Sequence, residues 1–452
     1  MKALRTLLLG SAGAVMLFVT GSVAQAADSP EAVKGREPVW RCDTAGFIEY
    51  PGSDWCFKVG IDSVTFWMGG TEDQVKTGDK GFDVFDIWHD GHTHDTEGGF
   101  GGNDEHAEPL PTGHFDDDTF WMSVWARPYF DVRRATELGI VRLFADFQIN
   151  EDAGIAGRHA FIQIGNWLLG NTTTVFYQSI GRVDLFDEGF GAPGRASPGR
   201  VVQVRYTFNA GNGVTVIVAL QDPAGRDEFI DSDWDTIADG RNEAPDFAAN
   251  ASVKGSWGAL GANVLVHQHS FKVTDGPFAG TDVTSDREIG WAAWLGGEVN
   301  LGPNDTLLVA VAYSDGLASA LSTGAAGDLG IRDGTSYEGV VSWSVSGGWE
   351  HQWSPTFGSV LAAGYAENDY GSIDPDMCSH GAGDCGWASG LHEGILEAVA
   401  VWGSLIWSPV ENLDLGVTVM WGQNDRVIFH NGSVSVETSD AIGAGFTATV
   451  GY

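Results

Sequence analysis

The sequence predicts an all-β fold, a transmembrane antiparallel β-barrel of about 16 strands. Segments in which apolar and polar residues alternate recur along the chain, and short and long connections alternate between them. The segment from Ala441 to Tyr452 carries an apolar or aromatic residue at every second position and ends on an aromatic one. A period of two describes a β-strand with one face in an apolar medium. A strand of a soluble β-sandwich shows the same pattern. Other features of the sequence must therefore decide between a membrane barrel and a soluble sandwich.

The N-terminus has the pattern of a secretory signal peptide. Lys2 and Arg5 precede a short apolar stretch, and Ala24-Gln25-Ala26 fits the A-x-A cleavage rule. No later apolar run is long enough for a membrane helix, so the exported chain is either soluble or a barrel. We expect three parts: a signal peptide at 1–26, an N-terminal periplasmic or lumenal segment with a disulfide at 27–56, and the transmembrane barrel at 57–452.

The composition favours strands joined by turns. Gly occurs 63 times, Trp 18 times and Phe 24 times, and the mean hydropathy is close to zero. Many glycines oppose a helical core, because each costs up to ~1 kcal/mol in a helix. A length of 452 residues suits either two or three soluble domains or one closed barrel.

The charge is strongly acidic, with 61 acidic residues against 24 basic ones and a formal net charge of -37. This balance excludes a nucleic-acid partner, since phosphate binding needs a basic surface. An acidic surface attracts cations and repels anions. The alternative interpretation is that the charge serves solubility or adaptation to a saline habitat.

Charged residues occur in the middle of several predicted strands. Arg127, Arg142 and Arg205 lie on the polar faces of alternating segments whose other faces are apolar. A mid-strand charge is costly against lipid but acceptable against a water-filled lumen. The predicted strands are 57–69, 119–132, 139–150, 158–169, 173–180, 200–209, 214–222, 247–257, 261–271, 287–300, 306–315, 336–352, 358–367, 392–407, 414–424 and 440–452. Short turns and long loops alternate between them, as turns in the periplasm and loops outside the cell do in an outer-membrane barrel.

Four cysteines occur as two local pairs, and an even count in an exported chain implies disulfides. Three connectivities exist in principle. Sequence proximity favours Cys42–Cys56 and Cys378–Cys385. A zinc site is disfavoured because neither pair has C-x-x-C spacing.

Three stretches resemble the alphaproteobacterial outer-membrane porin family, whose members are general diffusion porins. The most specific is the Cys-to-Cys segment 41–60, RCDTAGFIEYPGSDWCFKVG, which leads into the first strand. The others are Thr136-Glu137-Leu138-Gly139, followed by Ala160-Phe161-Ile162-Gln163, and the turn at 407–417, WSPVENLDLGV. The chain departs from the family in ending on Tyr452, where Phe is more usual, and in its long acidic first loop.

This resemblance implies a trimeric barrel of about sixteen strands whose third loop folds into the lumen and narrows the channel. Here that loop is expected at 181–199. A constriction with carboxylates on one wall and arginines on the other creates a transverse field across the waterway. The candidate constriction residues are Asp184, Asp187, Glu188 and Arg182 on the loop and Arg127, Arg142 and Arg205 on the wall. The alternative interpretation is that these arginines only pair with lumenal carboxylates.

The first long loop is rich in histidine and aspartate. His89, His92 and His94 are candidate metal ligands, and carboxylate runs suit divalent cations such as Ca²⁺. No ligand spacing matches a known motif, so we favour a hydrated acidic loop bridged by divalent ions to lipopolysaccharide. No resident cofactor is predicted.

We therefore predict a bacterial outer-membrane channel, not an enzyme, for passive diffusion of small hydrophilic solutes and ions. The acidic charge favours cations, and the expected partners are these solutes, outer-membrane lipid, lipopolysaccharide and two further copies of the chain. One alternative is a substrate-specific channel on the same barrel. A barrel enzyme or an adhesin is another, although G-x-S-x-G, H-E-x-x-H and P-loop motifs are absent.

Overall fold

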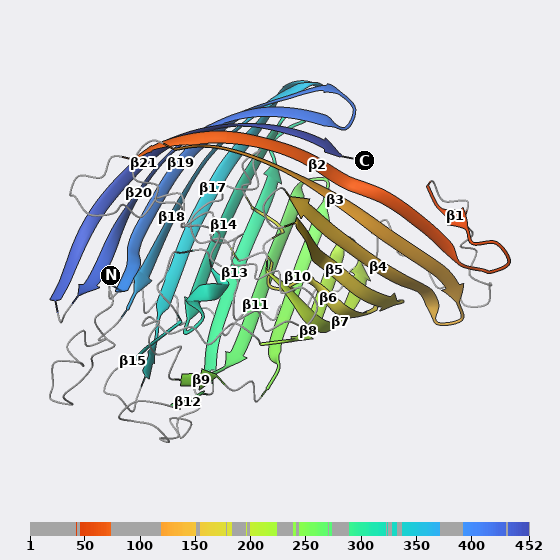
Figure 1. Cartoon of the computed structure of the whole chain (residues 1–452), viewed down its shortest axis with the longest axis horizontal. Helices are drawn as coiled ribbons and strands as arrows, with labels where there is room; N and C mark the ends of the chain where they lie inside the picture. Colours follow the sequence, from red (N-terminus) through yellow and green to blue (C-terminus); the bar gives the residue numbers. More distant parts are fainter. Residues whose placement is uncertain are drawn as a thin grey trace.

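The structure, a computed structural model, forms one closed antiparallel barrel (Figure 1). It describes residues 42, 46–73, 119–150, 154–177, 179–182, 196, 199–223, 238–240, 244–269, 271–273, 289–321, 323, 328–331, 337–370, 392–430 and 433–451. The predicted signal peptide, the first-loop histidines His89, His92 and His94, and the pair Cys378 and Cys385 lie outside these residues.

Sixteen long strands build the wall, which confirms the fold class and the strand count. They are β2 (Cys56–Asp73), β3 (Thr119–Thr136), β4 (Gly139–Asn150), β5 (Gly154–Ile164), β6 (Trp167–Thr173), β7 (Arg200–Gly211), β8 (Val214–Gln221), β10 (Asp246–Gly255), β11 (Gly258–Gln268), β13 (Ile289–Asn300), β14 (Asp305–Asp315), β17 (Val341–Ser354), β18 (Phe357–Asp369), β19 (His392–Val410), β20 (Leu413–His430) and β21 (Ser433–Gly451). Each pairs with its neighbour along the chain, and β2 closes the barrel by pairing with both β3 and β21.

The remaining elements are short. They are β1 (Ile48–Glu49), which pairs with β2, the pairs β9 (Ala238–Gly240) with β12 (Phe271–Val273) and β15 (Leu329–Ile331) with β16 (Tyr337–Gly339), and the 3-10 helix η2 (Ala318–Ala320). No helix of the described residues is long and apolar enough to cross a membrane.

The outer face of the barrel is apolar, as the alternation predicts. Val202 and Val204 are 56% and 44% exposed, while Gln203 between them is 2% exposed. The same reversal recurs along the other strands, where exposed Leu361, Val417 and Ile442 point outward. Such a continuous exposed apolar face suits lipid rather than water.

Aromatic residues lie near both ends of this outer face. Trp167 packs on Tyr206 near the short turns, whereas Trp291 packs on Tyr313 near the long loops. Trp67 does not lie on this outer face. It is 4% exposed and belongs to an interior cluster with Trp402 and Met420, because the register places it on the inner face of β2.

The short turns use the residues that tight hairpins require. Asn212 and Gly213 both have positive φ, 51° and 76°, as in a type I′ turn. A Cβ on Gly213 would lie 1.9 Å from the carbonyl oxygen of Lys254, so only glycine serves there. One predicted turn is wrong: β5 and β6 meet at Gly165-Asn166, not near residue 171, because Gly165 supplies the positive φ.

The third long loop therefore begins at Thr174 rather than at Gly181, and it enters the barrel as predicted. Its first residues are fixed to the inner wall by hydrogen bonds. Asn263 donates to the carbonyl oxygen of Val175 at 2.8 Å, and Trp294 donates to that of Phe176 at 2.6 Å. Phe176 and Ile180 are each 1% exposed.

Small residues on the wall make room for this loop. A Cβ on Gly296 would lie 2.0 Å from the carbonyl oxygen of Ile180, and one on Gly261 would lie 2.9 Å from its side chain. The loop after β14 enters the barrel too, since Leu321 forms an isolated bridge with Ala196 of the third loop. Together the two loops and the wall bury an apolar core that includes Leu265, Trp294 and Leu317.

Candidate functional site

Arginines converge on the inner wall formed by β3 to β7. Arg200, Arg158, Arg127 and Arg205 all act electrostatically on His159, which lies on β5. Two of them come from β7 and one each from β3 and β5, so four basic side chains from three strands lie within electrostatic reach of His159. We call these four residues the arginine group.

A β-bulge explains how Arg158 and His159 both face the lumen. Asp146 pairs with His159 and Phe147 pairs with Gly157, so Arg158 is the extra residue. A bulge lets two successive side chains share one face of the sheet. Arg158 then donates to Oε1 of Gln148 at 2.5 Å, and a hydrogen bond of 2.8 Å joins His159 to Thr172.

Asp146 is the carboxylate inside the arginine group. It is 7% exposed, and its Oδ1 lies 3.9 Å from Nε of Arg158. Asp62 also acts on Asp146. The arginine group thus has at least one buried carboxylate among its guanidinium groups.

A second cluster lies nearer the turn between β3 and β4. Asp131, 3% exposed, accepts hydrogen bonds from Arg133 at 2.7 and 2.9 Å and from Arg142 at 2.8 and 3.0 Å. Bidentate guanidinium–carboxylate pairs hold both partners in fixed geometry. This carboxylate therefore neutralises part of the charge of the two arginines.

The structure brings together only some of the predicted constriction residues. Arg127 and Arg205 share the arginine group, whereas Arg142 belongs to the Asp131 cluster. Arg182 lies in the third loop, with its guanidinium 5.0 Å from the centre of the Tyr177 ring. The loop carboxylates Asp184, Asp187 and Glu188 lie outside the described residues.

Arg158, His159 and Arg200 were not predicted. Arg158 and Arg200 stand at the first positions of predicted strands, and the alternation puts Arg200 on the same face as Val202. The bulge at Arg158 also breaks the period of two that would have placed it. The sequence offered one signal for Arg158 and Arg200: each is a charged residue at the start of a largely apolar predicted strand.

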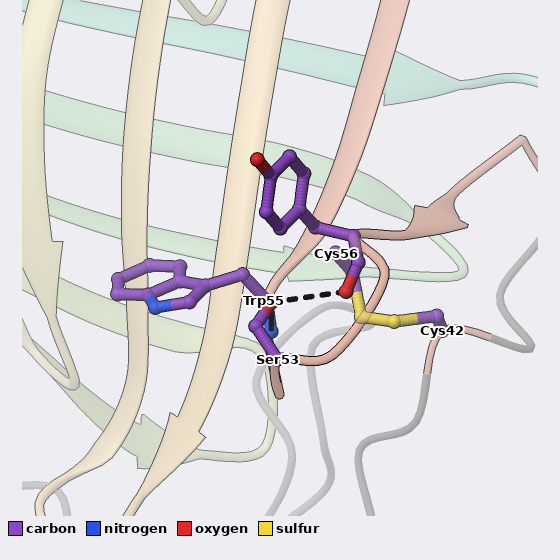
Figure 2. Close-up of a disulfide and its surroundings, with 5 residues drawn as sticks. Cys42, Ser53, Trp55 and Cys56 are labelled. Carbon is purple, nitrogen blue, oxygen red and sulfur yellow. Dashed lines mark hydrogen bonds between the residues drawn. A yellow bond between two sulfur atoms is a disulfide. The ribbon is translucent and has the colours of Figure 1, made fainter.

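The N-terminal segment is fastened to the barrel near the start of β2. The predicted disulfide Cys42–Cys56 is present and joins the chain before β1 to the start of β2 (Figure 2). Beside it, the backbone N–H of Trp55 donates to Oγ of Ser53 at 3.2 Å. Arg133 lies 4.9 Å from the ring centre of Phe47, so this segment also packs on β3.

The described residues offer no group of three or more His, Cys, Asp or Glu side chains that could hold a metal ion. Their geometry defines a class of protein all the same: an outer-membrane-type barrel with an apolar exterior, a charged inner wall and an inward-folded loop.

Comparison with known proteins identifies the family. Residues 113–444 match the porin subfamily, so this chain belongs to that family. It is 25% identical over 359 residues to porin Omp2b of Brucella canis and to that of Brucella suis, covering 74% of this chain and 81% of each relative. The outer membrane channel DcaP of Acinetobacter baumannii has a similar fold, with a TM-score of 0.61 at 17% identity over 88% of this chain and 97% of that one.

The chain is thus a porin of the outer membrane. Membership in this family makes it a channel protein.

Proposed function

We propose that this porin is a general diffusion channel for small hydrophilic solutes and ions, that it prefers cations, and that it works as a homotrimer. The observation that carries the proposal is the position of the third loop beside the arginine group. Thr172 bonds to His159 and Thr173 pairs with Arg200, and the loop leaves the wall at the next residue. The narrowest part of the waterway is then the space between this loop and the arginines.

The transverse field at that point comes from charges of opposite sign. Arg127, Arg158, Arg200 and Arg205 supply the positive side. Asp184, Asp187 and Glu188, which follow on the same loop, would supply the negative side. Polar solutes align in such a field, whereas apolar solutes lose hydration without compensation.

The cation preference rests on the whole chain. With a net charge of -37, the potential at both mouths is negative and concentrates cations. The effect is largest in dilute salt, where the Debye length is about 30 Å at 0.01 M. The arginine group opposes it inside the lumen, so the two contributions must be separated by measurement.

Reversal potentials in planar bilayers under a KCl gradient provide that test. A cation-selective potential that weakens as the salt concentration rises supports the proposal. An anion-selective potential in dilute salt would show that the arginine group dominates and would refute the cation preference.

Two further measurements test the remaining parts. Liposome swelling with sugars of increasing size should give rates that fall smoothly with size. Saturation by one solute would instead favour a substrate-specific channel. Electrophoresis without heating should show a detergent-resistant oligomer that dissociates on heating, and a monomer before heating would contradict the trimer.

A further inference from the structure

Aromatic rings form a continuous surface on the inner face of β3 to β5. Tyr129 and Phe144 lie 6.0 Å apart between ring centres, and Phe144 and Phe161 lie 5.2 Å apart, both pairs stacked. The ring of His159 follows at 6.4 Å from Phe144. All four side chains are partly exposed. We call Tyr129, Phe144 and Phe161 the aromatic patch.

The register of three strands creates this patch. Phe144 and Phe161 are direct cross-strand partners, so their side chains stand side by side on the lumen face. Tyr129 leans over β2, where its partner is Gly60. A Cβ on Gly60 would come within 2.6 Å of the Tyr129 ring, so the glycine leaves the space that the ring occupies.

Basic groups lie over the same rings. Arg142 stands 4.6 Å from the ring centre of Phe144 and 5.5 Å from that of Phe161. Lys58 stands 5.5 Å from the ring centre of Tyr129. At the other end, His159 links the patch to the arginine group. The aromatic patch therefore adjoins the arginine group through His159.

Passive diffusion of small polar solutes does not use such a surface. Aromatic faces exposed to a water-filled lumen lose apolar burial, and a polar wall would serve a general pore equally well. A planar aromatic ring that carries an anionic group matches both the aromatic patch and the arginine group. Its ring packs against the parts of Phe144 and Phe161 that Arg142 leaves exposed, while its carboxylate accepts hydrogen bonds from guanidinium groups.

We propose that the aromatic patch and the adjoining arginine group form a binding site for planar aromatic carboxylates within the lumen. This inference rests on the proposed function, because the ligand reaches the site through the open channel. It does not conflict with a preference for small cations. Ion preference follows the mean potential along the whole path, whereas this site acts through local contacts.

Current block in planar bilayers tests the site on the wild-type protein. Benzoate carries both a planar ring and a charge, cyclohexanecarboxylate has the charge without a planar ring, and benzyl alcohol has the ring without the charge. We expect benzoate to block half the KCl current at a concentration about three to ten times lower than either of the others. Equal concentrations for benzoate and cyclohexanecarboxylate would overturn the proposal.

A matched pair of substitutions on one strand sharpens the test. Phe144→Leu removes a ring of the patch, while Phe147→Leu removes a ring that packs on Phe130 at 6.3 Å on the outer face. Only the first should abolish the advantage of benzoate. If Phe144→Leu does not assemble, Phe161→Leu replaces it. If Phe144→Leu and Phe147→Leu both abolish the advantage of benzoate, the proposal of a lumenal site is refuted.

Binding is also measured without conduction, by saturation-transfer NMR of benzoate on the wild type and Phe147→Leu proteins in detergent, with empty micelles as the background. A protein that conducts KCl but shows neither block nor transfer overturns the site alone. A protein that binds benzoate but conducts no KCl keeps the site and overturns the proposed channel function.

Discussion

The inner faces of two parts of the barrel wall carry different side chains. From β3 to β7 the wall presents arginines, carboxylates and partly exposed rings. From β8 to β14 it presents Ala219, Ala248, Leu265, Ala292 and Trp294, all buried. Figure 1 shows these strands as neighbouring parts of one sheet.

The difference lies in what covers each region. The third loop and the loop after β14 pack on the wall from β8 to β14 and exclude water there. Apolar residues are then stabilised by burial, at about 25 cal/mol per Å². The wall from β3 to β7 carries charged side chains instead, and its buried carboxylates Asp131 and Asp146 lie beside arginines. The covered inner face is therefore largely apolar, and its buried polar side chains, such as Asn263 and His267, are hydrogen-bonded.

The largest expected effect comes from separating the loop from the wall. Gly296→Val places a side chain where the carbonyl oxygen of Ile180 lies, so the third loop must move. Overpacking of this kind costs about 1–3 kcal/mol of stability. We expect higher single-channel conductance, faster liposome swelling with large sugars and a lower heat-dissociation temperature.

Gly297→Val provides the control for this prediction. Its Cβ would meet a side-chain atom of Leu260 at 3.1 Å, which can rotate away. Unchanged conductance in Gly296→Val would show that the loop does not limit permeation.

The second largest effect is expected from the wall formed by β3 to β7. Replacing Arg127 and Arg205 with Gln should shift the reversal potential toward cations, because each charge is worth about 1 kcal/mol to an ion ~4 Å away in water. That energy corresponds to about a fivefold change in permeability ratio per charge. Neutralising Asp184, Asp187 and Glu188 should shift it toward anions, and salt-gradient recordings measure both.

Arg134→Gln is a suitable control for the arginine pair. This side chain is directed to Asp54 at 3.3 Å, at the N-terminal segment and away from the arginine group. An equal shift from Arg134→Gln would mean that overall charge, not position, sets the preference.

A smaller effect is expected from one loop anchor. Trp294→Phe keeps most of the buried ring but removes the hydrogen bond to Phe176, at a cost of about 1 kcal/mol. The heat-dissociation temperature should fall and open-channel noise should rise. Trp291→Phe, on the outer face of the same strand, should change neither quantity. Similar results for both variants would argue against anchoring by Trp294.

The smallest effect on the lumen should follow removal of the disulfide. Cys42→Ser with Cys56→Ser opens a link across 14 residues that lies outside both compared regions. Limited proteolysis should cut the N-terminal segment faster, while conductance stays as in the wild type. A changed conductance would place this segment in the permeation path. Peptide mapping without reduction will test Cys378–Cys385 in the same samples.

The sequence determined much of this protein by itself. The period of two, the alternation of turns and loops and the closing strand at 440–452 gave a barrel with the correct number of strands. They also placed Arg127, Arg142 and Arg205 on the lumen face, because a strand has only two faces and lipid excludes charge from one. The disulfide Cys42–Cys56 followed from proximity in an exported chain.

Other features depended on tertiary structure. The bulge at Arg158 changes which side chains face the lumen, and it exists only in the pairing of β4 with β5. The separation of Arg142 from the arginine group follows from its bonds to Asp131 on another strand. Which inner faces are apolar depended on where two distant loops pack. A single strand's pattern records its two faces, but whether water or another segment covers the inner one is set by residues far away in the chain.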